Sequence, residues 1–300
     1  VIGAIYEARP NVTIDIAALA IKSGNAVVLR GGTAAEHSNR ALVDVLKDAM
    51  SYCSLNPDAI QSVDEFGRPG ANDMMQAVGL IDVLIPRGGH ELIQTVVNQS
   101  KVPVIETGEG VVHIFVDETA RADWATEIIV NAKVQKIGAC NAVETLLVHS
   151  KAYDRVMPQV IAALKSLEVT LHGDERTQES FEGIVPATEQ DWETEYLAMD
   201  LAIKTVDSLD EALEHIGRYS TKHTEAIITE DYTNAERFIN EVDSAAVMVN
   251  ASTRFTDGGE FGFGAEVGIS TQKLHARGPM GLPELTSTKW IVRGTGHVRP

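Results

Sequence analysis

The sequence contains only two cysteines, Cys53 and Cys140, among 300 residues. Secreted proteins that depend on disulfides are much richer in cysteine, so this count argues against a disulfide framework and favours a reducing compartment, with the cytoplasm as the default. Each thiol is therefore expected to be either a small packed side chain or a reactive group.

Apolar runs long enough to cross a membrane are also missing, since charged residues or glycines interrupt every run before roughly 18 residues. The N-terminus lacks the basic and then apolar order of a secretory signal. No membrane role is expected. Because the sequence opens at Val1, inside a strand-like run and without a Met, we expect it to be part of a longer protein.

Positive charge is scarce as well, because 25 Lys and Arg stand against 43 Asp and Glu, giving a formal net charge of -18. Nucleic acids and anionic membranes require clustered positive charge, so neither is expected as a partner. An anionic small molecule would depend on local arginines, which makes the following residues candidates: Arg9, Arg30, Arg87, Arg254 and Arg277.

What the sequence has in abundance is apolar residues, 44% of the total, in alternating strand and helix patterns. Residues 1–6 and 25–30 are typical of strands, and residues 11–23 between them of a helix capped by Asn11 or Thr13. A strand, helix and strand in this order imply a parallel sheet. Further strands are predicted at 81–85, 103–106, 111–117, 169–171, 225–229 and 245–249, and further helices at 34–50, 90–100, 151–167, 208–218 and 232–242. The length and the pattern predict two α/β domains, the second beginning near Cys140.

Two predicted strands end in the same tripeptide, Arg30-Gly31-Gly32 and Arg87-Gly88-Gly89, directly before a helix. Parallel sheets bind ligands at the carboxyl ends of their strands. Glycines let backbone N–H groups approach a phosphate, and an arginine can pair with one. The sequence lacks a GxGxxG fingerprint, so a dinucleotide site and two plain tight turns both remain open.

The stretch from residue 131 to residue 148 places Cys140 on a polar turn that leads into an apolar strand. Small neighbours leave such a thiol accessible, and Lys133 and Lys136 lie close enough upstream to stabilise a thiolate. The alternative is that Cys140 is a buried small apolar side chain.

Three other segments carry candidates. Glu106 and Glu109 lie on a glycine-bearing loop, where solvated carboxylates are an alternative to acid–base groups. Arg254 lies in a long polar loop, 250–259, and such loops are often functional. Residues 287–293 are typical of a strand without a local partner, which suggests addition to the sheet of another subunit.

Blocks distributed along the whole sequence resemble the γ-glutamyl phosphate reductases, a family within the aldehyde dehydrogenase superfamily. Within residues 206–227, the spacing is similar to the signature pattern of that family at Ala212, His215, Ile216, Ser220, His223 and Glu225. The other matching blocks are 5–19, 23–32, 85–89, 130–135, 140–148, 241–259 and 264–282.

The resemblance implies an aldehyde dehydrogenase-like α/β fold with two Rossmann-like three-layer domains and a β oligomerisation arm. It implies an NADPH-binding domain over residues 1–132, with its N-terminal part missing. A catalytic domain that carries the cysteine is implied over residues 133–283, and an arm strand over residues 284–300.

The activity implied by the resemblance is the NADPH-dependent reduction of L-glutamyl 5-phosphate to L-glutamate 5-semialdehyde and phosphate, the second step of proline biosynthesis. Cys140 would form a thioester, and Asn11 or Asn141 would assist the backbone N–H of Cys140 at the carbonyl oxygen. Hydrolytic aldehyde dehydrogenases use a glutamate near Glu106, which a reductive reaction does not require, so Glu106 is expected to be idle.

The same resemblance assigns both Arg-Gly-Gly turns to NADPH, with Arg30 at its 2′-phosphate, and Arg9 and Arg254 to the substrate's carboxylate or phosphate. No metal is expected. A homo-oligomer is expected, and the glutamate kinase of the pathway is a candidate partner. Two rival interpretations remain: a hydrolytic NAD-dependent aldehyde dehydrogenase and a non-catalytic scaffold of the same fold. A requirement for inorganic phosphate in the reverse reaction would distinguish the reductase from a hydrolytic aldehyde dehydrogenase. A Cys140 thiol that reacts near neutral pH would distinguish an enzyme from a scaffold.

Overall fold

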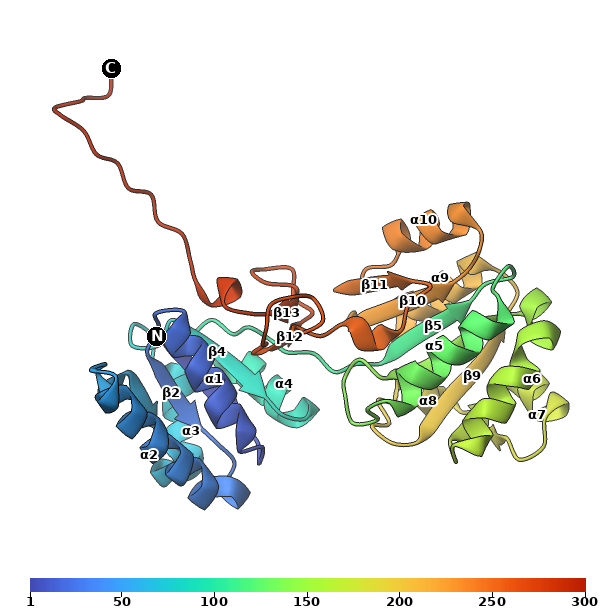
Figure 1. The fold of residues 1–300 in the computed structure, drawn as a ribbon, viewed down its shortest axis with the longest axis horizontal. Coiled ribbons are helices and arrows are strands. Elements are labelled where there is room, and N and C mark those ends of the chain that lie inside the picture. The colour runs from blue at the N-terminus through green and yellow to red at the C-terminus, as the bar shows by residue number, and fades with distance from the viewer.

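The computed structural model describes residues 1–300, which form two parallel sheets at opposite ends of the molecule with a hairpin between them (Figure 1). The first sheet has the order β3-β2-β1-β4 and consists of β1 (Ile2–Tyr6), β2 (Val27–Arg30), β3 (Ile60–Ser62) and β4 (Val83–Arg87). The hairpin pairs β12 (Gly268–Ser270) with β13 (Gly278–Met280) in antiparallel register. The expected α/β class with parallel sheets is confirmed.

The second sheet has seven parallel strands in the order β11-β10-β5-β6-β9-β7-β8. Its strands are β5 (Val112–Val116), β6 (Val143–His149), β7 (Thr170–Gly173), β8 (Val185–Pro186), β9 (Asp200–Val206), β10 (Thr224–Ile228) and β11 (Ala246–Val249). β5 and β6, at its centre, are buried over their whole length, because helices cover both faces of the sheet.

Helices cover both faces of the first sheet because successive strand residues point to opposite sides. Ala4 and Tyr6 pack with α1 (Asn11–Lys22) and α2 (Glu36–Tyr52). Ile5 points the other way and packs with α3 (Gly67–Gln76) and α4 (His90–Gln99). The hairpin joins the α1 side of this core through Val267 and Met280.

The second sheet is covered in the same manner. One face packs against α5 (Ala122–Val134) and α6 (Ser150–Ser166), and the other against α9 (Leu209–Tyr219) and α10 (Tyr232–Glu241). The short helices α7 (Glu175–Ser180) and α8 (Glu189–Glu193) lie on either side of β8 in the chain. Single 3-10 turns complete the structure: η1 (Thr33–Ala35), η2 (Pro57–Ala59), η3 (Asp64–Phe66), η4 (Thr253–Phe255) and η5 (Pro283–Leu285).

The predicted helices and most predicted strands are confirmed, whereas β3, β8, β9, β12, β13, α3, α7 and α8 were not foreseen. The strand predicted at 103–106 is wrong, because only Val104 makes an isolated bridge, to Leu84. The cap predicted for α1 is also wrong, since Pro10 occupies that position without a side-chain cap and Asn11 is already helical.

The boundary between the two sheets lies earlier than the predicted one between residues 132 and 133. β5 pairs with β6 and β10, so β5 and α5 belong to the second sheet. Residues 267–285 pack on the core of the first sheet instead of on that of the second. Residues 287–300 extend away from the body without a strand (Figure 1), and pairing of 287–293 with another subunit stays a prediction.

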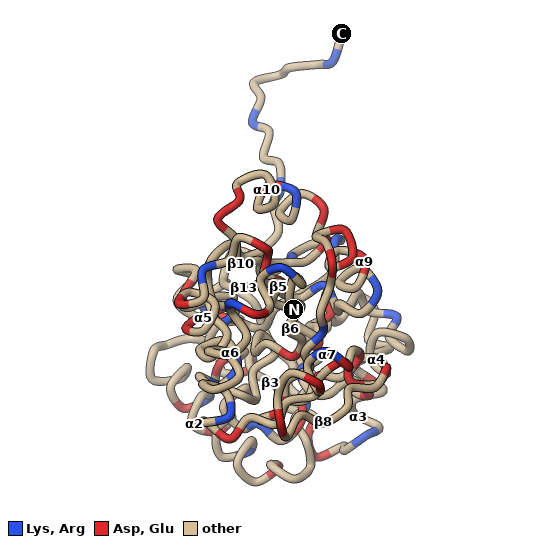
Figure 2. Tube along the Cα trace, turned by 90° about the vertical axis from the view of Figure 1, so that its right-hand side faces the viewer, with Lys and Arg blue, Asp and Glu red and all other residues tan.

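Acidic and basic residues are interspersed along the chain in the view of Figure 2 instead of being separated by sign. None of the helices combines the length and apolar character needed to cross a membrane.

Candidate active site between the two sheets

Cys140 lies on the turn between α5 and β6, at the amino edge of the second sheet. Its side chain is half-buried and lines a cavity of about 580 Å³. The turn Arg87-Gly88-Gly89, at the carboxyl end of β4, lines the same cavity, as does Glu7 just after β1. β1 and β4 flank the point where the strand order of the first sheet reverses, the usual ligand crevice of such sheets. The alternative of a fully buried Cys140 is therefore wrong.

The loop that precedes β5 packs directly against the cysteine turn. A Cβ atom on Gly110 would collide with the carbonyl oxygen of Cys140, so the two backbones approach as closely as only glycine permits. The N–H of Gly110 donates to Oε1 of Glu195 at 2.8 Å. Thr107 of the same loop donates to the carbonyl of Pro86 on β4 at 2.8 Å. This loop therefore fixes the thiol relative to the first sheet.

Asn141 is held at two points by the segment that follows β11. The hydroxyl of Thr253 donates to the Asn141 carbonyl at 2.7 Å, and the Asn141 amide donates to the Thr256 carbonyl at 2.8 Å. Asn141 is 3% exposed and lines the cavity. One function of its side chain is thus to fix the turn that carries Cys140.

Asn11 is not brought to the cysteine. It lies exposed on the first turn of α1, where its amide donates to Oδ2 of Asp15 at 3.2 Å, and it is not part of the cavity wall. The structure therefore gives no support to the catalytic assignment of Asn11.

The charges around the thiol differ from those expected. Lys133 does not face Cys140, because its buried ammonium pairs with Oε2 of Glu144 at 2.5 Å and donates to the Val143 carbonyl at 3.1 Å. Burial raises the pKa of Cys140 to about 11, and the nearby carboxylates Glu195 and Glu266 add to this, whereas Arg87 lowers the pKa. Arg87 is therefore the cation that favours the thiolate.

The cavity is lined by both signs of charge. Arg9 and Arg254 are among its cations, as expected, and Lys136 is another. Nε of Arg254 donates to Oε1 of Gln135 at 2.7 Å. Of the carboxylates in the cavity wall, only Glu109 was named as a candidate from the sequence. Glu7 could also have been found from the sequence, because it directly follows a predicted strand. The cavity wall carries Glu7, Glu109, Glu195, Asp257 and Glu266.

Arg30-Gly31-Gly32 lies at the end of β2, beside β1 but outside the wall of the Cys140 cavity. Nε of Arg30 donates to the Gly67 carbonyl at 3.3 Å, and the N–H of Gly31 donates to Oδ1 of Asp64 at 2.7 Å. A Cβ atom on Gly32 would lie 2.9 Å from the backbone nitrogen of Ala8. The turn is thus held tightly against the segment after β1. Its Gly31 N–H already donates to Asp64, so that N–H is not available to a phosphate.

Comparison with known proteins identifies the family. Residues 10–180 match the aldehyde dehydrogenase family. The whole chain is 64% identical to γ-glutamyl phosphate reductase of Leifsonia xyli, covering 71% of that protein, and 60% identical to that of Thermobifida fusca, covering 72%. The crystal structure of γ-glutamyl phosphate reductase from Thermotoga maritima superimposes with a TM-score of 0.96 at 50% identity, over 100% of this chain and 72% of that one.

The chain belongs to the γ-glutamyl phosphate reductase family. An acetylating aldehyde dehydrogenase from Geobacillus thermoglucosidasius shares the fold, with a TM-score of 0.77 at 18% identity over 100% of this chain and 75% of that one.

In this member of the γ-glutamyl phosphate reductase family, Glu106 is not among the residues that line the Cys140 cavity. It lines a neighbouring hollow of about 210 Å³, where Gln94 donates to its carboxylate at 3.2 Å and its backbone N–H donates to Gln272 at 3.0 Å. This position agrees with the expectation that Glu106 does not act on the thiol.

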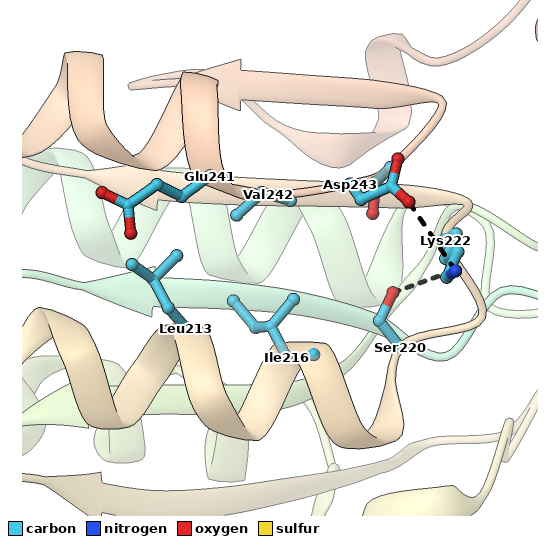
Figure 3. Close-up of a pocket in the computed structure, with 9 residues that line it drawn as sticks. Leu213, Ile216, Ser220, Lys222, Glu241, Val242 and Asp243 are labelled. Carbon is cyan, nitrogen blue, oxygen red and sulfur yellow. Dashed lines mark hydrogen bonds and ion pairs between the residues drawn. The ribbon is translucent and has the colours of Figure 1, made fainter.

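A further hollow of about 180 Å³ lies between α9 and α10 (Figure 3). Asp243 lies at one end, with Nζ of Lys222 3.6 Å from its carboxylate. The same carboxylate pairs with Lys273 at 2.7 Å and Arg277 at 2.9 Å, both from the hairpin connection. Asp243 thus ties the helices of the second sheet to the hairpin. Cys140 is not among the residues that line this hollow.

Proposed function

We propose that the chain reduces L-glutamyl 5-phosphate to L-glutamate 5-semialdehyde and inorganic phosphate with NADPH, in the second step of proline biosynthesis. One observation carries the proposal: Cys140 and the Arg87-Gly88-Gly89 turn line one cavity between the sheets, in a chain of this family. A nucleophile and a crevice suited to a dinucleotide are what this chemistry requires.

In the proposed mechanism, the Cys140 thiolate attacks the acyl phosphate carbon, a C–S bond forms, the C–O bond to phosphate breaks, and phosphate leaves. Bound NADPH would supply the hydride that reduces the resulting thioester to the anion of a thiohemiacetal. The C–S bond then breaks, which releases the aldehyde and restores the Cys140 thiolate.

Two groups of the chain favour the attack. Arg87 lowers the pKa of Cys140 against the effect of burial, so it stabilises the attacking thiolate. The N–H of Cys140 makes no backbone–backbone hydrogen bond, so no carbonyl of the protein competes with the substrate's carbonyl oxygen for it as that atom becomes negative. Such a donor typically contributes about 3 kcal/mol. The side-chain amide of Asn141 is a second candidate, once it releases Thr256.

The residues at the carboxyl edge of the first sheet fit a dinucleotide. A Cβ atom on Gly32 would crowd the backbone of Ala8, and one on Gly88 would lie 2.8 Å from the Glu7 carboxylate, so both glycines keep the chain compact at this edge. The hydrogen bond of the Arg30 side chain is made by Nε alone, to the Gly67 carbonyl, which leaves the other two guanidinium nitrogens for a ligand. We assign the part of the chain that forms the first sheet to NADPH binding, with Arg30 at the 2′-phosphate and Arg87-Gly88-Gly89 nearer the reacting end of the cofactor. The part that forms the second sheet is assigned to catalysis.

We expect Arg30→Ala to weaken NADPH more than NADH, by about ten-fold or more in the ratio of the two dissociation constants, because NADH lacks the 2′-phosphate. Fluorescence titration of each cofactor measures this ratio. Arg40→Ala is the control, since Arg40 is an exposed residue of α2 that pairs with Glu36. Equal losses for both cofactors would show that Arg30 does not bind the 2′-phosphate.

Arg9 and Arg254 are proposed to hold the anionic groups of the substrate, because both line the Cys140 cavity. We further propose a cytoplasmic homo-oligomer in which residues 287–293 pair with another subunit, and contact with the glutamate kinase that supplies an acyl phosphate.

The reverse reaction tests the proposal. We expect oxidation of glutamate 5-semialdehyde by NADP⁺ to require inorganic phosphate, because phosphate releases the acyl group from Cys140. Turnover without phosphate would instead indicate a hydrolytic aldehyde dehydrogenase. A protein that binds neither cofactor and shows no turnover would be a scaffold.

A further inference from the structure

Glu195 lies on the connection between α8 and β9, and its side chain lines the Cys140 cavity. Oε1 accepts the hydrogen bond from Gly110, whose backbone lies against the Cys140 carbonyl. Oε2 makes no hydrogen bond within the protein. One oxygen is therefore fixed relative to the thiol, and the other is free for a ligand.

The residues that follow Glu195 are anchored on both sides. The hydroxyl of Tyr196 donates to Oδ1 of Asp191 at 2.6 Å, and its ring stacks on His172 with centroids 5.3 Å apart. The N–H of Leu197 donates to Oε1 of Glu144 at 3.3 Å.

Leu197 itself has a φ of 50°, in the left-handed region that a leucine seldom occupies. Such a conformation persists only where the surrounding structure enforces it, and it is found most often at functional sites. The connection thus presents Glu195 to the cavity in a fixed orientation.

The other carboxylates of the wall already have partners or nearby cations. Glu109 pairs with His90 at 3.1 Å, and Glu7 accepts the N–H of Gly89 at 3.0 Å. Asp257 accepts two backbone N–H groups, from Gly259 and Glu260. Glu266 accepts the N–H of Gly258 and has two cations in its vicinity, Arg87 and Lys136.

Glu195 is distinguished by its anchor, since its partner Gly110 packs against the Cys140 carbonyl, and the cation Arg9 lies near it. Burial raises the pKa of Glu195 and Glu109 raises it further, whereas the nearby Arg9 lowers it. The side chain of Arg9 lines the cavity and makes no hydrogen bond or ion pair within the protein. A free carboxylate and a free guanidinium therefore face one cavity without bonding to each other.

A molecule that carries an ammonium and a carboxylate on one carbon complements this pair. The proposed substrate has both groups on its α-carbon, at the opposite end from the carbonyl that Cys140 attacks. We infer that Glu195 binds the α-ammonium of the substrate and Arg9 its α-carboxylate. The inference rests on the proposed function and states how this cavity distinguishes an amino acid from other aldehydes and acyl phosphates.

Glu195→Gln tests the inference, since glutamine can still accept the hydrogen bond from Gly110 but lacks the charge. The assay is phosphate-dependent oxidation by NADP⁺ of two aldehydes, glutamate 5-semialdehyde and 5-oxopentanoate, which is the same molecule without its amino group. We expect kcat/KM for the first to fall about ten- to a hundred-fold relative to the second, mostly through KM, because a charged hydrogen bond is lost for one aldehyde alone. Glu193→Gln, an exposed glutamate two residues away, is the matched control and should leave the ratio unchanged.

An equal fall for both aldehydes would overturn the inference, because Glu195 would then act on a step that the two share. An unchanged ratio with undiminished activity would overturn it as well. Failure of the proposed function is distinguishable, since the unsubstituted protein would then oxidise neither aldehyde in the presence of phosphate.

Discussion

Replacement of Cys140 by alanine is expected to lower the rate of phosphate-dependent oxidation of glutamate 5-semialdehyde by roughly 10⁴- to 10⁶-fold, because no covalent acyl intermediate can form. Binding of NADPH should persist, since both Arg-Gly-Gly turns belong to the first sheet and Cys140 to the turn before β6. Steady-state rates and a cofactor titration on the same preparation measure the two effects.

Cys53→Ala is the matched control for this experiment. Cys53 is the other thiol of the chain, lies exposed after α2, and is remote in sequence from the Cys140 turn. We expect it to retain the activity of the unsubstituted protein. If Cys140→Ala turned over at a comparable rate, the thioester mechanism would have to be abandoned.

Replacement of Lys133 by methionine is expected to destabilise the fold by about 3–5 kcal/mol, because it leaves Glu144 buried without its counter-charge. Both side chains are 0% exposed, and their charged atoms lie 2.5 Å apart. Unfolding in urea, followed by circular dichroism, measures the loss. Adding Glu144→Gln should recover most of it, since the amide is uncharged and its oxygen can still accept the N–H of Leu197.

The loss in Lys133→Met should depend on pH in a defined direction. Burial raises the pKa of Glu144 to about 7 even with Lys133 present, and removal of the lysine raises the pKa further. Between the unfolded pKa, near 4.5, and the folded one, the folded state binds more protons, so stability falls as pH rises. The variant should therefore be less destabilised at pH 5 than at pH 8. Lys151→Met, which breaks an exposed pair with Glu118, should have little effect at either pH.

The Lys133–Glu144 pair also shows why sequence reasoning misassigned a residue of the site. Lys133 lies seven residues before Cys140, which favoured a role at the thiolate. In the fold, α5 directs it toward β6, where Glu144 takes its charge. Glu144 in turn holds Leu197, the neighbour but one of Glu195. The lysine thus supports the cavity wall through a carboxylate that local spacing does not reveal.

Much of the architecture was determined by the sequence alone. Apolar periodicity specifies which segments form strands and helices and which side of each is buried, so the parallel pairing of β1 and β2 and the position of Cys140 before β6 were predicted correctly. The family blocks were likewise visible in the residues. These features depend on neighbours along the chain.

Only the tertiary structure decided which distant polar groups meet. It placed β5 in the second sheet, packed the hairpin on the first, kept Asn11 away from the thiol and brought Glu195 to it. A hydrophobic pattern specifies burial but not the partner of a buried charge. That partner is set by how the loops at the facing edges of the two sheets fold against each other, and those loops carry no periodicity.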